Sequence, residues 1–171
     1  MRPEPRPVDD VDAIVAAWRR ERPDLDVTPL EVLSRVSRLA RRLDLARGSA
    51  FSEHQLDSWA FDVLSALRRA GEPYELSPGQ LVQQTLVSSG TMTNRVDRLE
   101  RSGYVARRPD PADRRGVLVR LTTAGRDVVD AAMADLLEQE KTLLNDLPTS
   151  DQRRLAALLR QMLAPLESHD G

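Results

Sequence analysis

The chain has 171 residues, a length that fits one domain or one compact two-lobed unit. Hydrophobic residues make up 40% of it, enough for a buried core, and no run of about 18 apolar residues predicts a membrane span. The chain has no cysteine, which excludes disulfides, thiolate metal sites and thiol switches. Residues 1–7 lack the apolar segment of a secretory signal, so we expect a disordered tail there and a cytoplasmic protein.

The net charge of −2 argues by itself against a nucleic-acid partner, but the charges are unevenly distributed. The segment from Ser88 to Arg120 holds eight arginines and four acidic residues, a net charge of +4, which leaves −6 for the rest of the chain. A basic excess of this kind is either a solvated face or the footprint of a nucleic-acid binder. Its position on the helix and hairpin described below favours nucleic acid.

Three helices are expected in the N-terminal third. Residues 8–22 show apolar residues at three- and four-residue spacing, and Pro23 ends the pattern. The sequence from Thr28, with proline next, begins a long helix that reaches about residue 45. Ser52 and Gln55 fit a capping box for a third helix over residues 54–70, which is apolar around most of its circumference and should be buried on several sides.

Residues 77–103 are typical of two short helices joined by a turn. Ser77 and Gln80 form a capping box at the start of the first helix. The second helix begins after a serine cap at position 88 or 89 and ends at Gly103. On this second helix Met92, Val96 and Leu99 fall on one face, which predicts that this face is buried.

The opposite face of the second helix carries small polar residues near its N-terminus and arginines behind them. This arrangement suits a helix that lies in the major groove of DNA. The candidate DNA contacts on this helix are Ser88, Ser89, Thr91, Thr93, Asn94 and Arg98.

Two short strands follow, over residues 104–108 and 116–121, and residues 74–76 are a candidate third strand. The turn between the two strands contains Asp113, Arg114 and Arg115. A hairpin directly after a helix-turn-helix is a wing, and arginines at its tip suit a narrow minor groove. We expect Asp113 to orient an arginine, Arg114 to contact the flanking backbone and Arg115 to bind DNA.

Two further helices are expected, one from Thr123 to about residue 146 and one after Pro148, where Thr149 and Gln152 fit a capping box. Their apolar faces, with those of the N-terminal helices, pack either into an internal core or against a second copy of the chain. The combined apolar surface looks too large for one small lobe, which favours a homodimer.

The segment from Ser89 to Gly125 resembles the winged helix of the MarR family of bacterial transcriptional regulators, and the wing sequence 110–115 is its most specific part. The resemblance covers roughly residues 29–163. It implies a mainly α fold with a small β wing, in which a winged helix-turn-helix lobe is carried on a helical dimerisation scaffold. The expected division is a tail at 1–7, N-terminal helices at 8–50, the winged helix-turn-helix domain at 51–122 and C-terminal dimerisation helices at 123–168. It also implies a repressor that binds palindromic operator DNA.

Four residues outside the DNA-reading set stand out. Asp62 is the only charge between Ser58 and Arg68, Arg107 shares a strand face with Val105, and Arg95 lies at the inner border of the second helix. Taken singly, Asp62 could face solvent, Arg107 could bind a DNA phosphate, and Trp18 could pack against a helix.

Together, Trp18, Asp62, Arg95 and Arg107 resemble the pattern of the urate-responsive subgroup of the MarR family, some relatives of which respond to citrate or aconitate. The resemblance implies a small anionic effector bound by these four residues. We expect Asp62 to pair with Arg95 or Arg107 in the free protein and the effector to break that pair. Citrate, an aconitate or a phenolic acid remains an alternative to urate.

No phosphate-binding loop, nucleophile motif or zinc-binding helix motif is present, so we expect neither an enzyme nor a cofactor. The two histidines, His54 and His169, lie far apart in the sequence, which makes a metal site improbable. The alternative from another class is a winged-helix module that binds a protein through its hairpin and does not bind DNA.

Overall fold

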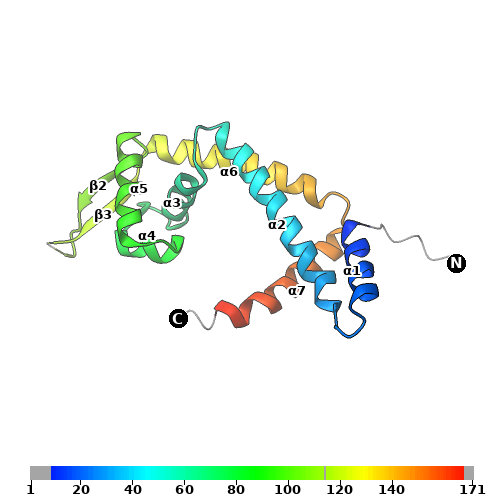
Figure 1. Cartoon of the computed structure of the whole chain (residues 1–171). Coiled ribbons are helices and arrows are strands. Elements are labelled where there is room, and N and C mark those ends of the chain that lie inside the picture. Colours follow the sequence, from blue (N-terminus) through cyan, green and yellow to red (C-terminus); the bar gives the residue numbers. More distant parts are fainter. Residues whose placement is uncertain (1–8, 114, 168–171) are drawn as a thin grey trace. The chain divides into compact units, whose positions relative to one another are not determined.

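The computed structural model describes residues 9–113 and 115–167, so the tail expected over residues 1–7 lies outside the described residues. Within them the chain forms seven helices and one three-stranded antiparallel sheet (Figure 1). It divides into two compact units between Ala46 and Arg47, which are described separately below. No helix of the described part is both long and apolar enough to cross a membrane.

The N-terminal unit consists of α1 (Asp10–Glu21) and the first part of α2 (Thr28–Ser52). Asp9 caps α1, because its carboxylate accepts hydrogen bonds from the backbone of the first turn. Arg35 of α2 donates to Asp9 at 2.8 Å, and this bond lowers the pKa of the Asp9 carboxyl. The core of the unit is small and contains Val11, Val15 and Val27, with Leu30 packed against it.

The second helix is longer than the sequence pattern indicated and ends at Ser52 instead of near residue 45. No proline interrupts it, and its last turn carries the buried residues Ala50 and Phe51 into the core of the second unit. There Phe51 stacks on Phe61 of the next helix, with ring centroids 4.1 Å apart. Burial of these rings favours continuation of the helix.

The helix α3 (Ser58–Arg69) begins four residues later than expected, and the predicted capping box of Ser52 and Gln55 is wrong. Ser52 is the last residue of α2, and Gln55 has a left-handed backbone with φ of 56° in the connection. Asp57 occupies the N-cap position of α3 instead. The expected burial on several sides is confirmed, since six of its twelve residues are buried.

The helix-turn-helix consists of α4 (Pro78–Thr85) and α5 (Ser89–Arg101). The predicted capping box at Ser77 is present, and Ser88 is the cap of α5. The predicted buried face of α5 is confirmed, because Met92, Val96 and Leu99 are at most 2% exposed.

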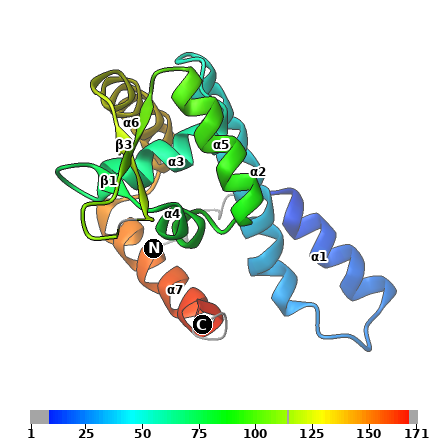
Figure 2. The ribbon, with the colours of Figure 1, turned by 90° about the vertical axis from the view of Figure 1, so that its left-hand side faces the viewer.

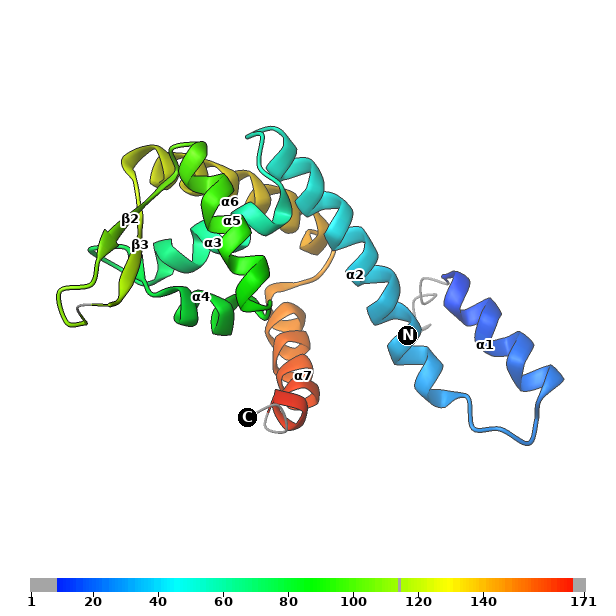
Figure 3. The ribbon, with the colours of Figure 1, turned by 60° about the vertical axis from the view of Figure 1, so that its left-hand side comes forward.

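The sheet consists of β1 (Glu75–Leu76), β2 (Val105–Pro109) and β3 (Val117–Leu121), in the order β1-β3-β2. In the register, Glu75 pairs with Arg120 and Arg107 pairs with Val119. The third strand expected next to the hairpin is therefore present. Figure 3 shows the hairpin extending beyond the helices α4 and α5, and Figure 2 shows the same lobe from the side of the hairpin.

The core of the second unit lies between α3, α4, α5, the sheet and α6 (Thr123–Leu144). α6 contributes Val129, Ala132 and Leu136, so this helix shares one core with the helix-turn-helix and the sheet. Thr122 caps α6 and also donates to the Gly103 carbonyl at 2.8 Å. This bond fixes the start of α6 to the chain between α5 and β2.

The last helix, α7 (Thr149–Glu167), follows Pro148 as predicted. The amide of Gln152 does not serve as part of a capping box, because it donates to the carbonyls of Leu144 and Leu147 at the end of α6. None of the side chains described on α7 is buried, although apolar residues recur along it. The expected fold class, mainly α with a small β wing, is confirmed.

Candidate nucleic-acid interface

The polar face of α5 is open to solvent. Its candidate DNA contacts are all exposed: Ser88, Ser89, Thr91, Thr93, Asn94 and Arg98. Three of the hydroxyl groups are held in place, since Ser88 Oγ lies 2.9 Å from Thr91 Oγ1 and Thr93 donates to the Ser89 carbonyl at 3.1 Å. The buried face of α5 packs into the core, so the helix presents this polar face at a fixed angle.

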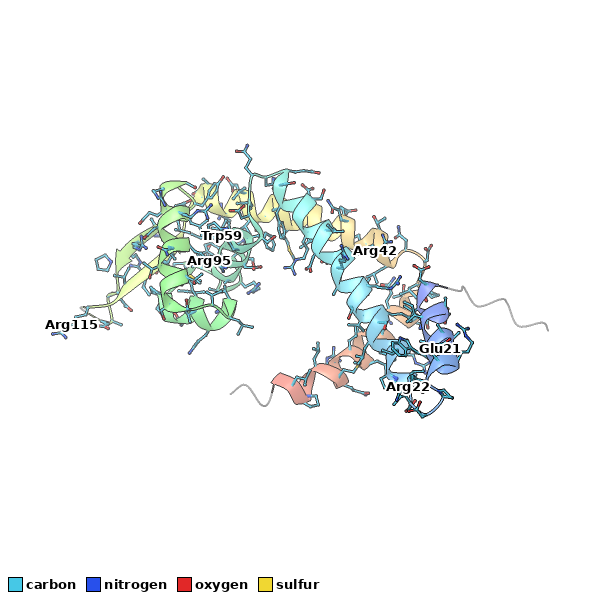
Figure 4. The ribbon with its side chains drawn as sticks, in the orientation of Figure 1. Glu21, Arg22, Arg42, Trp59, Arg95 and Arg115 are labelled. Carbon is cyan, nitrogen blue, oxygen red and sulfur yellow. The ribbon has the colours of Figure 1, made fainter. Side chains whose placement is uncertain are left out.

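Arg98 is held by Trp59 of α3 and by Asp57, the N-cap residue of that helix. Its Nη2 donates to the Asp57 carboxylate at 3.2 Å, and its guanidinium carbon lies 4.6 Å from the centroid of the Trp59 ring. Arg95 lies on the same ring at 5.7 Å, and Figure 4 shows Trp59 and Arg95 beside each other. A depression of about 230 Å³ is lined by Trp59, Thr91, Asn94, Arg95 and Arg98.

The tip of the wing has a tight turn and an exposed arginine. Asp113 accepts a hydrogen bond from the backbone N–H of Arg115 at 2.9 Å, which holds the turn, and its expected role in orienting an arginine side chain stays a prediction. Gly116 allows the turn to close, because a Cβ there would lie 2.9 Å from the Cβ of Asp110. Arg115 extends from this tip (Figure 4), and Arg114 lies outside the described residues.

Arg107 joins the wing to α5. Its Nη1 donates to Glu100 at 2.5 Å, its Nη2 donates to Asp97, and its backbone N–H donates to Glu100 at 2.9 Å. The side chain is 31% exposed. Burial by itself lowers the pKa of Arg107, but the hydrogen bonds to the two carboxylates outweigh it, so the pKa is raised. The anion that the sequence led us to expect at Arg107 is therefore supplied by α5 itself.

The expected pairing of Asp62 with Arg95 or Arg107 is wrong in the part of the chain that the structure describes. Arg107 is occupied by Asp97 and Glu100, and the guanidinium of Arg95 lies over an indole ring. The nearest cation to Asp62 is Arg47, at 3.8 Å, and both side chains are more than 40% exposed. Helix periodicity could not reveal this arrangement, because it does not show which elements supply the partners of a charge.

Trp18 belongs to the N-terminal unit and is 47% exposed. It follows the buried residues Val11 and Val15 on α1 but is not part of their cluster. Packing within the N-terminal unit therefore buries only part of the Trp18 side chain. Its role in effector binding stays a prediction.

The base of the wing contains a buried charge that the sequence did not single out. The Glu75 side chain is only 6% exposed and lies between Arg108, which donates to it, and Arg120, whose Nε is 3.6 Å from Oε1. The hydrogen bond to Glu75 raises the pKa of Arg108. Because these residues come from β1, β2 and β3, the cluster ties all three strands together.

Sequence reasoning also missed Asp57 and the outward position of Trp59. Trp59 lies on the helix that was expected to be buried on several sides, but it is half-buried and covered by two arginines. An available signal was the pair Asp57 and Trp59 at the start of a helix, since an indole N–H two residues after a carboxylate can reach it. The cationic partners from α5 could not be inferred without the fold.

An exposed polar helix followed by an arginine-tipped hairpin defines a winged helix-turn-helix of the DNA-binding class. The model of the MarR family matches residues 54–116. The chain is 39% identical over 150 residues to the HTH-type transcriptional regulator PecS from Dickeya dadantii, covering 88% of this chain and 90% of that protein. The chain belongs to the MarR family of transcriptional regulators.

Two solved structures resemble the chain in fold. A mutant MarR from E. coli complexed with operator DNA has a TM-score of 0.67 and 27% identity, covering 81% of this chain and 99% of that one. The BpsR protein of Bordetella bronchiseptica, described with regulation of its DNA binding by 6-hydroxynicotinic acid, has a TM-score of 0.58 and 30% identity, covering 75% of this chain and 98% of that one.

Proposed function

We propose that the protein is a homodimeric repressor that binds a pseudo-palindromic operator in the cytoplasm and is released by a small anionic metabolite such as urate. The observation that carries the DNA-binding part is the joint presentation of the α5 polar face and the arginine-tipped wing. The link from Arg107 to Asp97 and Glu100 holds the two surfaces in one orientation. The relative in complex with operator DNA has the same fold.

On this proposal, the N-terminal half of α5 reads base edges in the major groove and Arg115 enters the neighbouring minor groove. Hydroxyl and amide groups such as those of Thr91 and Asn94 are suited to base edges, and arginine suits a narrow minor groove. A dimer presents two such helices, which must match half-sites about 34–36 Å apart. Small changes in the spacing of the two lobes are then enough to weaken binding.

The homodimer is supported by apolar side chains that the single chain leaves in solvent. On α7 the residues Leu158, Leu163 and Leu166 are 50–66% exposed, and on α2 Val32 and Leu33 are each 51% exposed. A monomer that exposed such helix faces in water would have a strong tendency to associate. We therefore assign these faces to contacts with a second copy of the chain.

Replacing Arg115 by alanine is expected to weaken operator binding. It should also make the fall of log affinity with log salt concentration less steep by about one, because one phosphate-neutralising charge is lost. The matched control is Arg20→Ala, since Arg20 is an exposed arginine of α1 whose ion-pair partner among the described residues is Glu21. Fluorescence anisotropy at several salt concentrations measures both slopes. A slope unchanged by Arg115→Ala would remove the wing from the interface.

For the effector, we propose an anion that competes with Asp97 and Glu100 for Arg107. When an anion takes the guanidinium, two carboxylates of the recognition helix lose their partner and remain beside the DNA phosphates. The resulting repulsion weakens DNA binding. A ligand shifts such an equilibrium only by its different affinities for the two states, so attenuation of about 5- to 150-fold is the reasonable range.

Asp62 and Arg95 complete the proposed effector set in the second unit, and Trp18 is included by sequence resemblance alone. Asp62→Asn is expected to blunt release by the effector while leaving DNA affinity within about twofold of wild type. Its control is Asp127→Asn on α6, where the carboxylate is 70% exposed. Anisotropy with increasing effector gives both quantities, and an equal loss of DNA binding and effector response would count against the assignment.

The release of the protein from DNA by urate can be compared directly with its release by citrate, trans-aconitate and phenolic acids. A planar anion can stack on an aromatic ring, whereas citrate cannot. The compound named with BpsR, 6-hydroxynicotinic acid, is a planar aromatic carboxylic acid, which supports a planar anion as the effector of this protein. The alternative from another class, a protein-binding hairpin, predicts no salt-dependent retention on heparin and no binding to upstream DNA.

A further inference from the structure

The N-cap residue of α3 does not cap its helix. Asp57 has the extended backbone of an N-cap, yet its side chain accepts no hydrogen bond from the backbone of the first turn of α3. The carboxylate instead accepts from the indole Nε1 of Trp59 at 2.8 Å and from Nη2 of Arg98 at 3.2 Å, both at the same oxygen, Oδ2. A cap residue normally satisfies backbone N–H groups, so this carboxylate serves a different purpose.

Trp59 fixes the plane of the same arginine. The Arg98 guanidinium lies over the indole ring at 4.6 Å, while the indole N–H holds the carboxylate that Arg98 also contacts. Stacking restrains the orientation of the guanidinium, and the ion pair restrains its rotation within that plane. Arg98 is nevertheless 58% exposed, so part of its fork of donors remains open to a ligand.

We propose that Asp57 and Trp59 are positioning residues that preorganise Arg98 for operator binding. This inference rests on the proposed DNA-binding function and deepens it, because it identifies what prepares one of the DNA-contacting side chains. A free arginine loses much rotamer freedom when it binds, and one already held in place loses less. The two residues therefore increase operator affinity without touching DNA.

The opposite role, in which Asp57 withholds Arg98 from DNA, is less well supported. An exposed ion pair is weak by itself, so the carboxylate alone could not sequester the arginine effectively. The stacked ring, in contrast, leaves the edge of the guanidinium available and adds no negative charge. The arrangement therefore orients Arg98 more than it blocks it.

The test is a double-mutant cycle with Asp57→Ser, Trp59→Leu and Arg98→Ala, read by anisotropy on operator and on unrelated DNA. Serine at position 57 retains a good N-cap, which keeps α3 intact. With Arg98 present, we expect each of the two α3 variants to lower operator affinity by about 3- to 10-fold. In the Arg98→Ala background neither should have a further effect. Trp59→Phe, which keeps an aromatic face, should retain more affinity than Trp59→Leu.

Binding to unrelated DNA separates positioning from simple charge. Removing the Asp57 carboxylate should leave that binding unchanged or slightly tighter, whereas operator binding weakens; Asp127→Ser controls for loss of an exposed acid. Effects that persist undiminished without Arg98, or tighter operator binding by Asp57→Ser, would overturn the inference alone. Failure of the wild-type protein to bind operator DNA would instead overturn the proposed function and the inference with it.

Discussion

Replacing Gly125 by alanine is expected to destabilise the second unit by about 3 kcal/mol. A Cβ at this position would lie inside contact distance of the Tyr104 carbonyl oxygen and 2.9 Å from Leu121 Cδ1. Gly125 is buried in the first turn of α6, where that helix crosses the end of the sheet. The neighbouring atom is backbone, so it cannot move aside without shifting β2, and with it the wing.

Urea denaturation measures this effect. With a slope of about 2 kcal/mol per molar urea, the loss corresponds to a midpoint lower by about 1.5 M. The matched control is Gly48→Ala on α2, where a Cβ would meet nothing within 4 Å. That change is expected to stabilise the chain by about 0.5–1 kcal/mol, since alanine favours a helix interior. Equal midpoints for Gly125→Ala and wild type would contradict the packing described for α6.

Replacing Arg107 by alanine is expected to lower operator affinity by about 10-fold in the absence of any effector, equivalent to about 1.4 kcal/mol. The change leaves Asp97 and Glu100 without their shared cation on the recognition helix, close to the DNA phosphates. It also releases the side-chain link between β2 and α5. Because the pair is partly exposed, the accompanying loss of folding stability should be smaller, about 1 kcal/mol.

The result distinguishes two roles of Arg107. Arg107→Lys keeps the charge but cannot offer the planar fork that contacts both carboxylates, so its affinity should fall between those of alanine and wild type. Anisotropy without effector, followed by effector titration, gives the comparison. Unchanged binding of the free Arg107→Ala protein together with a lost effector response would mean that Arg107 is an effector contact only.

Much of the fold could be predicted because its signals are local. Capping residues and apolar spacing located α4, α5 and the hairpin nearly to the residue, and these depend on neighbours within one or two turns. The start of α3 was predicted four residues too early because the spacing of Ser52 and Gln55 also fits a capping box. What decided it was the burial of Phe51 against Phe61, a contact between elements.

The site could be predicted only in part, because some of its features depend on contacts between elements and not on local sequence. The exposed face of α5 follows from helix periodicity, since Met92, Val96 and Leu99 define the opposite side. The partners of Arg107 were not predictable, because strand alternation places its side chain on a face without showing which carboxylates lie there. The pairing of Asp62 with Arg95 or Arg107 was predicted wrongly for the same reason, because a sequence pattern does not show which charged residues of other elements lie near Asp62.

The DNA-binding assignment is tested most directly by fluorescence anisotropy of the purified protein on DNA from immediately upstream of its own gene. The titration is made at several salt concentrations, alone and with urate, xanthine, citrate or trans-aconitate. We expect the protein to bind this DNA tightly, with an affinity that falls steeply with salt, and to release the DNA when one of these compounds is added. Tight binding indifferent to all four would contradict the effector assignment, and no salt-sensitive binding to any DNA would contradict the winged-helix function itself.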